Sequence, residues 1–128
     1  MKKLLFSLLF VITAIFISCD DIFDKKIERY TVEIIAPYNG ATLKSGNIHF
    51  TWKALDGALK YQLVIVSPSF DRTLQVVVDT AVAVQDSAIV STYNHSVNLS
   101  EGNYQWYVQA QNFSYSSKKQ IYDLIIID

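Results

Sequence analysis

Alternation of apolar and polar positions with a period of two is the main signal in this chain. It is clearest between residues 103 and 112, where one face carries Tyr104, Trp106, Val108 and Ala110 and the other carries mostly glutamine. Such alternation is typical of a β-strand with one buried and one solvated face. Because the turn signal Glu101-Gly102-Asn103 precedes it, we expect residues 103–112 to form a central strand.

Six further segments have this alternating pattern. They are rich in β-branched and aromatic residues and are separated by turn residues. They predict strands at 30–36, 47–53, 60–67, 73–78, 88–97 and 120–127. We expect Ile48, Phe50 and Trp52 to face inward from the second strand. No window beyond the amino-terminal segment has helical spacing. The pattern therefore predicts an all-β fold, a seven-stranded antiparallel β-sandwich.

Aromatic residues at particular places in these strands resemble the fibronectin type III domain. They are Trp52, Tyr61 and Tyr104, with Leu99 before Tyr104 and Trp106 after it. The resemblance covers residues 30–128. It implies that Tyr104 forms the tyrosine corner of that family, in which the hydroxyl bonds back to the upstream backbone. The family's usual proline is missing from this turn, which is one residue shorter. An immunoglobulin-like sandwich of another topology is the alternative.

We expect four of these rings to meet between the two sheets and to form the structural core. They are Trp52, Tyr61, Tyr104 and Trp106.

The amino terminus has the pattern of an export signal. Lys2 and Lys3 precede a 14-residue apolar run over positions 4–17, shorter than the roughly 20 residues that a membrane-spanning helix needs. Its end, Phe16-Ile17-Ser18-Cys19, resembles a bacterial lipobox, although leucine is usual where Phe16 stands. We predict a cleaved signal-peptide helix over residues 1–18 and a lipid on Cys19. An ordinary secretory signal or an uncleaved anchor is the alternative.

Residues 19–29 are predicted to be the lipidated cysteine and a charged tether, which reaches at most ~35 Å. The acidic cluster of Asp20, Asp21 and Asp24 resembles a signal for the outer face of the outer membrane. In other bacteria, an aspartate directly after the cysteine means retention at the inner membrane. We expect a cell-envelope protein held in the outer membrane through its lipid and displayed on the surface.

Charge and composition exclude several classes of function. Removing Lys2 and Lys3 from the 11 basic residues leaves 9 against 12 acidic ones. A weakly acidic domain lacks the footprint of a nucleic-acid-binding protein. The single cysteine rules out an internal disulfide, and two histidines, His49 and His95, offer no metal-ligand spacing. Without a Gly-x-Ser-x-Gly elbow, paired carboxylates or a phosphate loop, we predict a protein that is not an enzyme and takes no metal or cofactor.

Three candidate binding surfaces remain, of which the third is Phe70 in the loop stretch 67–71, expected at the opposite pole from the second. One is the outer face of the third and sixth strands, where a tyrosine stands among amides suited to a glycan: Gln62, Gln105, Tyr107 and Gln109. A second is the loop with Phe113 and Tyr115, because binding loops favour aromatic and small polar residues. The resemblance to fibronectin type III domains implies that this loop lies at the same pole as Leu55 and Asp56. The ordinary explanations are a solvated strand face and rings that cap the end of the sandwich.

The final strand is apolar on both faces over Leu124–Ile127. As an exposed edge it would be a docking site for a partner's strand, and otherwise the tether or a neighbouring loop covers it. Two functions follow as hypotheses. The first is a non-enzymatic, membrane-anchored surface lipoprotein with one ligand-binding or adhesion-type module for a glycan or protein. The second is an accessory or inhibitor protein that docks on an envelope protein through its final strand.

Overall fold

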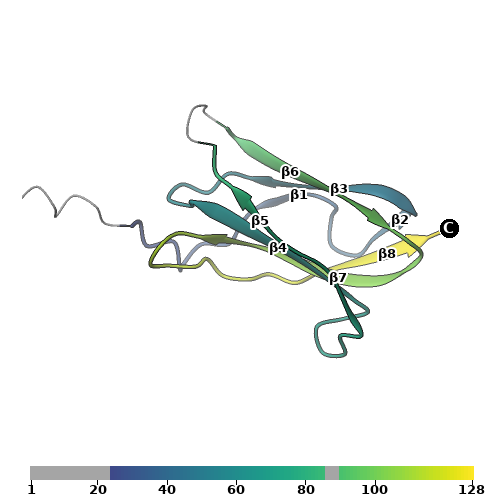
Figure 1. The fold of residues 1–128 in the computed structure, drawn as a ribbon. Coiled ribbons are helices and arrows are strands. Elements are labelled where there is room, and N and C mark those ends of the chain that lie inside the picture. The colour runs from purple at the N-terminus through teal and green to yellow at the C-terminus, as the bar shows by residue number, and fades with distance from the viewer. Residues whose placement is uncertain (1–23, 86–89) are drawn as a thin grey trace, which may run out of the picture.

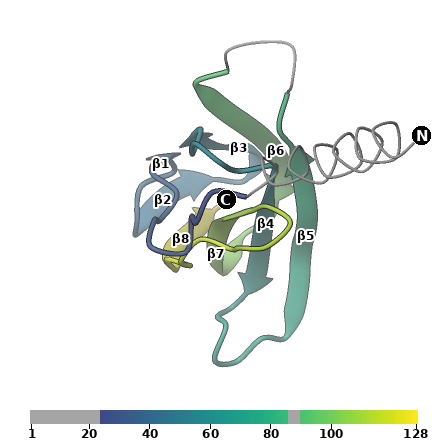
Figure 2. The ribbon, with the colours of Figure 1, turned by 90° about the vertical axis from the view of Figure 1, so that its left-hand side faces the viewer.

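The computed structural model describes residues 24–85 and 90–128, which fold into a two-sheet β-sandwich (Figure 1). The described strands are β1 (Ile34–Ala36), β2 (Ala41–Lys44), β3 (Gly46–Lys53), β4 (Lys60–Ser67), β5 (Gln75–Ala83), β6 (Thr92–Leu99), β7 (Gly102–Gln111) and β8 (Tyr122–Ile127). One sheet has the order β1-β3-β6 and the other the order β2-β8-β7-β4-β5. Figure 2 shows the two layers from one end of the sandwich.

The predicted all-β sandwich is confirmed, but the prediction of seven antiparallel strands is wrong in two respects. The described residues form eight strands, and β2 runs parallel to β8. The sequence analysis predicted no strand over Ala41–Lys44, because Pro37 and Asn39-Gly40 interrupt the alternation just before it.

The chain changes sheets directly after the segment predicted as the first strand. After β1 pairs with β3, the chain passes through Pro37 to the opposite sheet, where β2 pairs with β8 from Ala41↔Leu124 to Lys44↔Ile127. Because β7 pairs along the other side of β8, the final strand has a neighbour on both sides. The option of a docking edge at residues 124–127 is therefore wrong.

Other strand boundaries differ from the predicted ones at their ends. The strand predicted over residues 30–36 begins only at Ile34, and the one predicted over 73–78 continues to Ala83. The fifth predicted strand, 88–97, is found as Thr92–Leu99, and its first two residues lie outside the described part of the chain.

Alternate side chains of β3, β4 and β7 fill the space between the sheets, as their sequence pattern predicts. Trp52, Trp106 and Tyr61 are almost completely buried there, and Tyr104 is buried close to its turn. The rings do not form one stack. Trp52 lies 5.7 Å from Tyr61, whereas Trp106 packs at 4.8 Å against Phe50.

The end of the predicted tether belongs to the folded domain, which corrects the boundary at residue 30. Ile27 is 0% exposed and lies in the hydrophobic core cluster. Beside it, Lys25 forms an ion pair with Asp56 of the loop between β3 and β4, residues 54–59. The backbone carbonyl oxygen of Lys25 accepts a 2.8 Å hydrogen bond from the side-chain amide of Asn112. The sandwich therefore holds its amino-terminal segment from about residue 24 onward.

The sandwich has two ends with different contents. The end that we call proximal holds residues 24–30, the loop 54–59 and the loop between β7 and β8, residues 112–121 (Figure 1). The half that we call the distal end lies away from the entering chain and has the carboxyl terminus at its tip (Figure 1). The loop between β4 and β5, residues 68–74, belongs to this half and projects below the sheets in that view.

The predicted signal peptide and Cys19 lie outside the described residues. Among residues 24–85 and 90–128, no helix has the length and apolar character required to cross a bilayer.

Candidate binding surfaces

The outer face of the five-stranded sheet carries a small aromatic cluster around Tyr107. This residue lies opposite Val64 of β4, and its ring meets that of Phe70 edge-on at 5.4 Å. The ammonium group of Lys119 lies 4.9 Å from the centre of the Tyr107 ring, a cation–π contact. Phe70 comes from the loop 68–74, and its backbone N–H also bonds to Gln105 on this face. Tyr107 is therefore half-buried and already in contact with two side chains.

The three predicted glutamine contacts have hydrogen-bond partners within the domain. The Gln105 side chain accepts a 2.9 Å bond from the backbone N–H of Phe70 and donates to Asp123. Gln109 donates to the carbonyl oxygen of Ser117, and Gln62 donates to Asp79. A sugar ring on this face would compete with these bonds. Of the three, Gln105 holds the loop 68–74 against this face through the N–H of Phe70.

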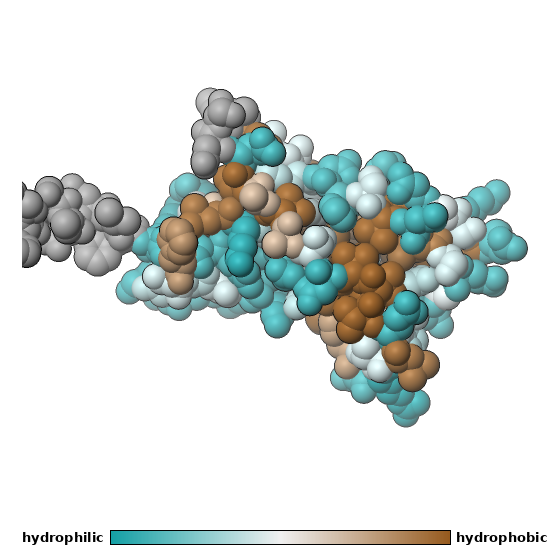
Figure 3. Space-filling model, in the orientation of Figure 1, coloured by the Kyte–Doolittle hydropathy of each residue, from teal (hydrophilic) through white to brown (hydrophobic). Residues whose placement is uncertain are grey.

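Apolar residues continue from this cluster to the distal end. Val66 of β4 is buried although it faces outward, and its β5 neighbour Val76 is 57% exposed. At the tip, Leu74 is 88% exposed. Figure 3 shows apolar side chains gathered at this end of β4 and β5.

At the proximal end, the structure separates the two predicted loop aromatics. Tyr115 turns inward and packs against the core, as the capping interpretation requires, whereas Phe113 is 89% exposed. Asn112 fixes the loop between them, since its side-chain oxygen accepts bonds from the backbone N–H groups of Ser114 and Tyr115. The loop meets the loop 54–59, as expected, through a bond from Asn112 to Gly57.

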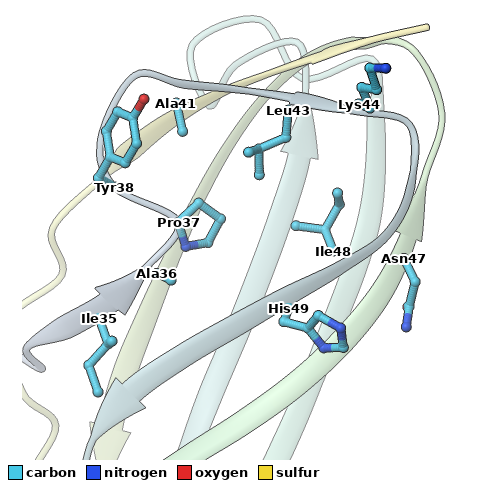
Figure 4. A pocket seen from close by; sticks show the side chains of 10 residues that line it. All are labelled: Ile35, Ala36, Pro37, Tyr38, Ala41, Leu43, Lys44, Asn47, Ile48 and His49. Carbon is cyan, nitrogen blue, oxygen red and sulfur yellow. The ribbon is translucent and has the colours of Figure 1, made fainter.

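A groove that the sequence interpretation missed lies on the side of the sandwich where β1 gives way to β2 (Figure 4). Its volume is about 460 Å³. Its apolar walls come from Ile35, Pro37, Tyr38, Leu43 and Ile48, and Lys44, Asn47 and His49 supply polar groups at its margin. Tyr38 is 71% exposed there.

One wall of this groove is an open backbone edge of β3. The N–H of Lys53 bonds to Glu33 on the β1 side, and the N–H of Ala54 bonds to Ser91 on the β6 side. Because backbone groups alternate in direction along a strand, the N–H and C=O groups of Asn47 and His49 point toward the groove. The β1 ladder ends at Ala36↔Thr51, so it does not reach them.

The clear pKa shifts at the proximal end come from one ion pair and from a buried tyrosine. The ion pair with Asp56 raises the pKa of Lys25, and Lys25 lowers the pKa of the Asp56 carboxyl, mainly through their hydrogen bond. Burial raises the pKa of Tyr61, although its hydroxyl accepts a bond from the N–H of Leu55. The side chain of His49 forms a hydrogen bond with that of Ser96 on the neighbouring strand β6, with 2.6 Å between Nδ1 and Oγ. Within the described ranges, no three His, Cys, Asp or Glu side chains come together as metal ligands.

Comparison with known proteins supports the fold and reaches no further. No family model matches the chain, and no curated protein sequence matches it. Among solved structures, the fn3 domain of the human collagen alpha-1(XX) chain is 15% identical with a TM-score of 0.51, over 79% of this chain and 90% of that one. A superoxide reductase (neelaredoxin) from Ignicoccus hospitalis is 13% identical with a TM-score of 0.53, over 78% and 82% of the two chains. The chain thus has the fold of fibronectin type III and immunoglobulin-like β-sandwich domains.

Proposed function

We propose that this chain is a lipid-anchored, non-enzymatic protein of the bacterial cell envelope whose β-sandwich binds an extended segment of another protein. The anchoring rests on the sequence, in which the single cysteine directly follows the apolar run and Ser18. The binding rests on one observation, the apolar groove beside the open edge of β3. We expect the protein to reach the outer membrane and the cell surface.

The groove suits an extended polypeptide because it combines two kinds of recognition. The free N–H and C=O groups of Asn47 and His49 can pair with the backbone of an added strand, and the apolar walls can take its alternate side chains. A glycan ligand on the Tyr107 face is less well supported, since the nearby amides already bond within the domain. Docking by pairing with β8 is not supported either, because β2 and β7 flank that strand.

Fatty-acid labelling of the full-length chain in bacterial cells tests the anchor. The wild-type protein should incorporate a labelled acyl chain and lose residues 1–18, whereas Cys19→Ser should incorporate none. Wild-type protein with an intact first residue and no acyl group would refute the anchor.

Proline substitution tests the groove. A proline at an edge position whose N–H is unpaired leaves the native ladder intact but blocks strand addition. Asn47→Pro changes the groove edge, and Asn98→Pro changes the outer edge of β6 at the paired position of the same sheet. With a photo-crosslinking residue at Tyr38, Asn47→Pro should abolish a discrete crosslink in cells that Asn98→Pro preserves. Equal crosslinking in both variants would refute the groove.

A further inference from the structure

The most exposed aromatic side chain in the described residues lies beside the point where the chain enters the domain. Phe113 is 89% exposed, and its neighbour Ser114 donates a 2.9 Å hydrogen bond to the carboxylate of Asp24. The residue on its other side, Asn112, bonds to the carbonyl oxygen of Lys25. Figure 1 shows the loop 112–121 and the entering chain at the end opposite the carboxyl terminus.

The exposure of Phe113 is built into the loop. Asn112 caps the following turn through two backbone N–H groups, and Tyr115 is packed inward. Gln111 and Ser116 form a bridge that closes the loop, and the backbone N–H of Ser117 bonds to the carbonyl oxygen of Ala110. A well-bonded loop therefore holds the phenylalanine ring outward, and most of its apolar surface is exposed to solvent.

The chain length before the domain limits how far this ring can be from a lipid on Cys19. Five residue steps separate Cys19 from Asp24, and a fully extended chain covers at most ~17 Å over that length. Because Asp24 is hydrogen-bonded to the loop that carries Phe113, this short chain also limits the distance between the loop and the lipid headgroups.

The neighbours of Phe113 have the chemistry of a membrane-contacting surface. Leu59, which is 43% exposed, and Lys60 line the same depression as Phe113. Exposed aromatic and aliphatic side chains enter the interfacial region of a bilayer, while a nearby lysine keeps its ammonium group among the headgroups.

We propose that the proximal end lies on the bilayer that holds Cys19, with Phe113 and Leu59 in the headgroup region. The proposal rests on the lipid anchor proposed above. It assigns Phe113 to the membrane rather than to a soluble ligand. It also directs the distal end, with Leu74, away from the membrane.

Two variants of the lipidated protein, each with one introduced cysteine besides Cys19, test this orientation in phospholipid vesicles. Since the acylated Cys19 has no free thiol, an introduced cysteine takes an environment-sensitive fluorophore alone. Phe113→Cys places it at the proximal end, and Leu74→Cys is the matched distal control, because the two native side chains are 89% and 88% exposed. We expect a blue shift at position 113, and quenching by lipids that carry a nitroxide just below the headgroup, with neither effect at position 74.

The outcomes separate the orientation from the anchor. If the protein floats with the vesicles and label 113 is not quenched, or label 74 is quenched as strongly, the orientation is wrong and the anchor stands. If the protein carries no acyl group and does not float with the vesicles, both proposals fail.

Discussion

The hydroxyl of Tyr104 donates a 2.7 Å hydrogen bond to the carbonyl oxygen of Ser100, four residues upstream. This bond closes the short turn between β6, in one sheet, and β7, in the other. It is the bond that the resemblance to fibronectin type III domains implied, and it forms although the turn lacks that family's proline. We therefore treat the turn as a fixed link between the two sheets.

Tyr104→Phe should lower the free energy of unfolding by about 1 kcal/mol, the usual contribution of one partly buried hydrogen bond. Urea denaturation measures the change. Tyr38→Phe is the control, because the Tyr38 side chain is 71% exposed and its loss of a hydroxyl should change stability by less than about 0.5 kcal/mol. Equal effects of the two substitutions would contradict the role of the Ser100 bond.

Trp106→Ala should cost ~3–5 kcal/mol, because it removes a fully buried ring that packs against Phe50 and Tyr122. This is a large part of a typical domain's stability, so we expect a steep fall in the melting temperature. Phe113→Ala removes a similar aromatic group from the loop that follows β7, where it is exposed, and should leave the melting temperature nearly unchanged. If Trp106→Ala had the same melting temperature as the parent protein, the assignment of Trp106 to the packed core would be wrong.

Stability should fall at alkaline pH through Tyr61. Burial raises the pKa of its hydroxyl above the ordinary value of 10.0, so the folded state binds the proton more tightly than the unfolded state. The resulting stabilisation is complete below pH 10 and is lost as the pH rises through the higher pKa of the folded state. The free energy of unfolding, followed by urea titration above pH 10, should decline less steeply in Tyr61→Phe, even though this variant loses the Leu55 bond. An identical slope in both proteins would refute the assignment.

Gly57→Ala should release the docked amino-terminal segment. A methyl group there would lie 2.7 Å from the Cβ of Lys25 and 3.1 Å from a methyl group of Ile27. Gly40→Ala is a matched control, because Gly40 also has a positive φ, +80° against +92°, but meets no atom within 4 Å. We expect faster proteolysis between residues 24 and 30 in Gly57→Ala only. If Gly57→Ala resisted proteolysis as well as Gly40→Ala, the segment would accommodate the added methyl group while remaining bound to the domain.

The sequence predicted the central strands well because each carries a long alternation with large residues on one face. β4 was predicted with its exact bounds, and β3 and β7 to within one residue at each end. The signal fails where an element is short or its pairing partner is distant in the chain. β2 has four residues after a turn signal, and only its parallel pairing with β8 makes it a strand.

The candidate sites were harder to predict for the same reason. Ile27 is a single apolar residue among charges, so no periodicity distinguishes it from a tether. The groove depends on the crossing of the chain from β1 to β2, which the sequence pattern does not reveal. The glutamines beside Tyr107 have the composition of a binding face, but their internal bonds to Phe70, Asp123 and Ser117 appear only in three dimensions.

The parallel pairing of β2 with β8 also bears on how the domain would respond to force. A pull between the amino-terminal segment and the end of β8 would slide these two strands past each other. Their four residue pairs, Ala41↔Leu124 to Lys44↔Ile127, would then share the load instead of opening one after another. A module tethered at one end and held by a partner near the other would resist shear better than its short second strand suggests.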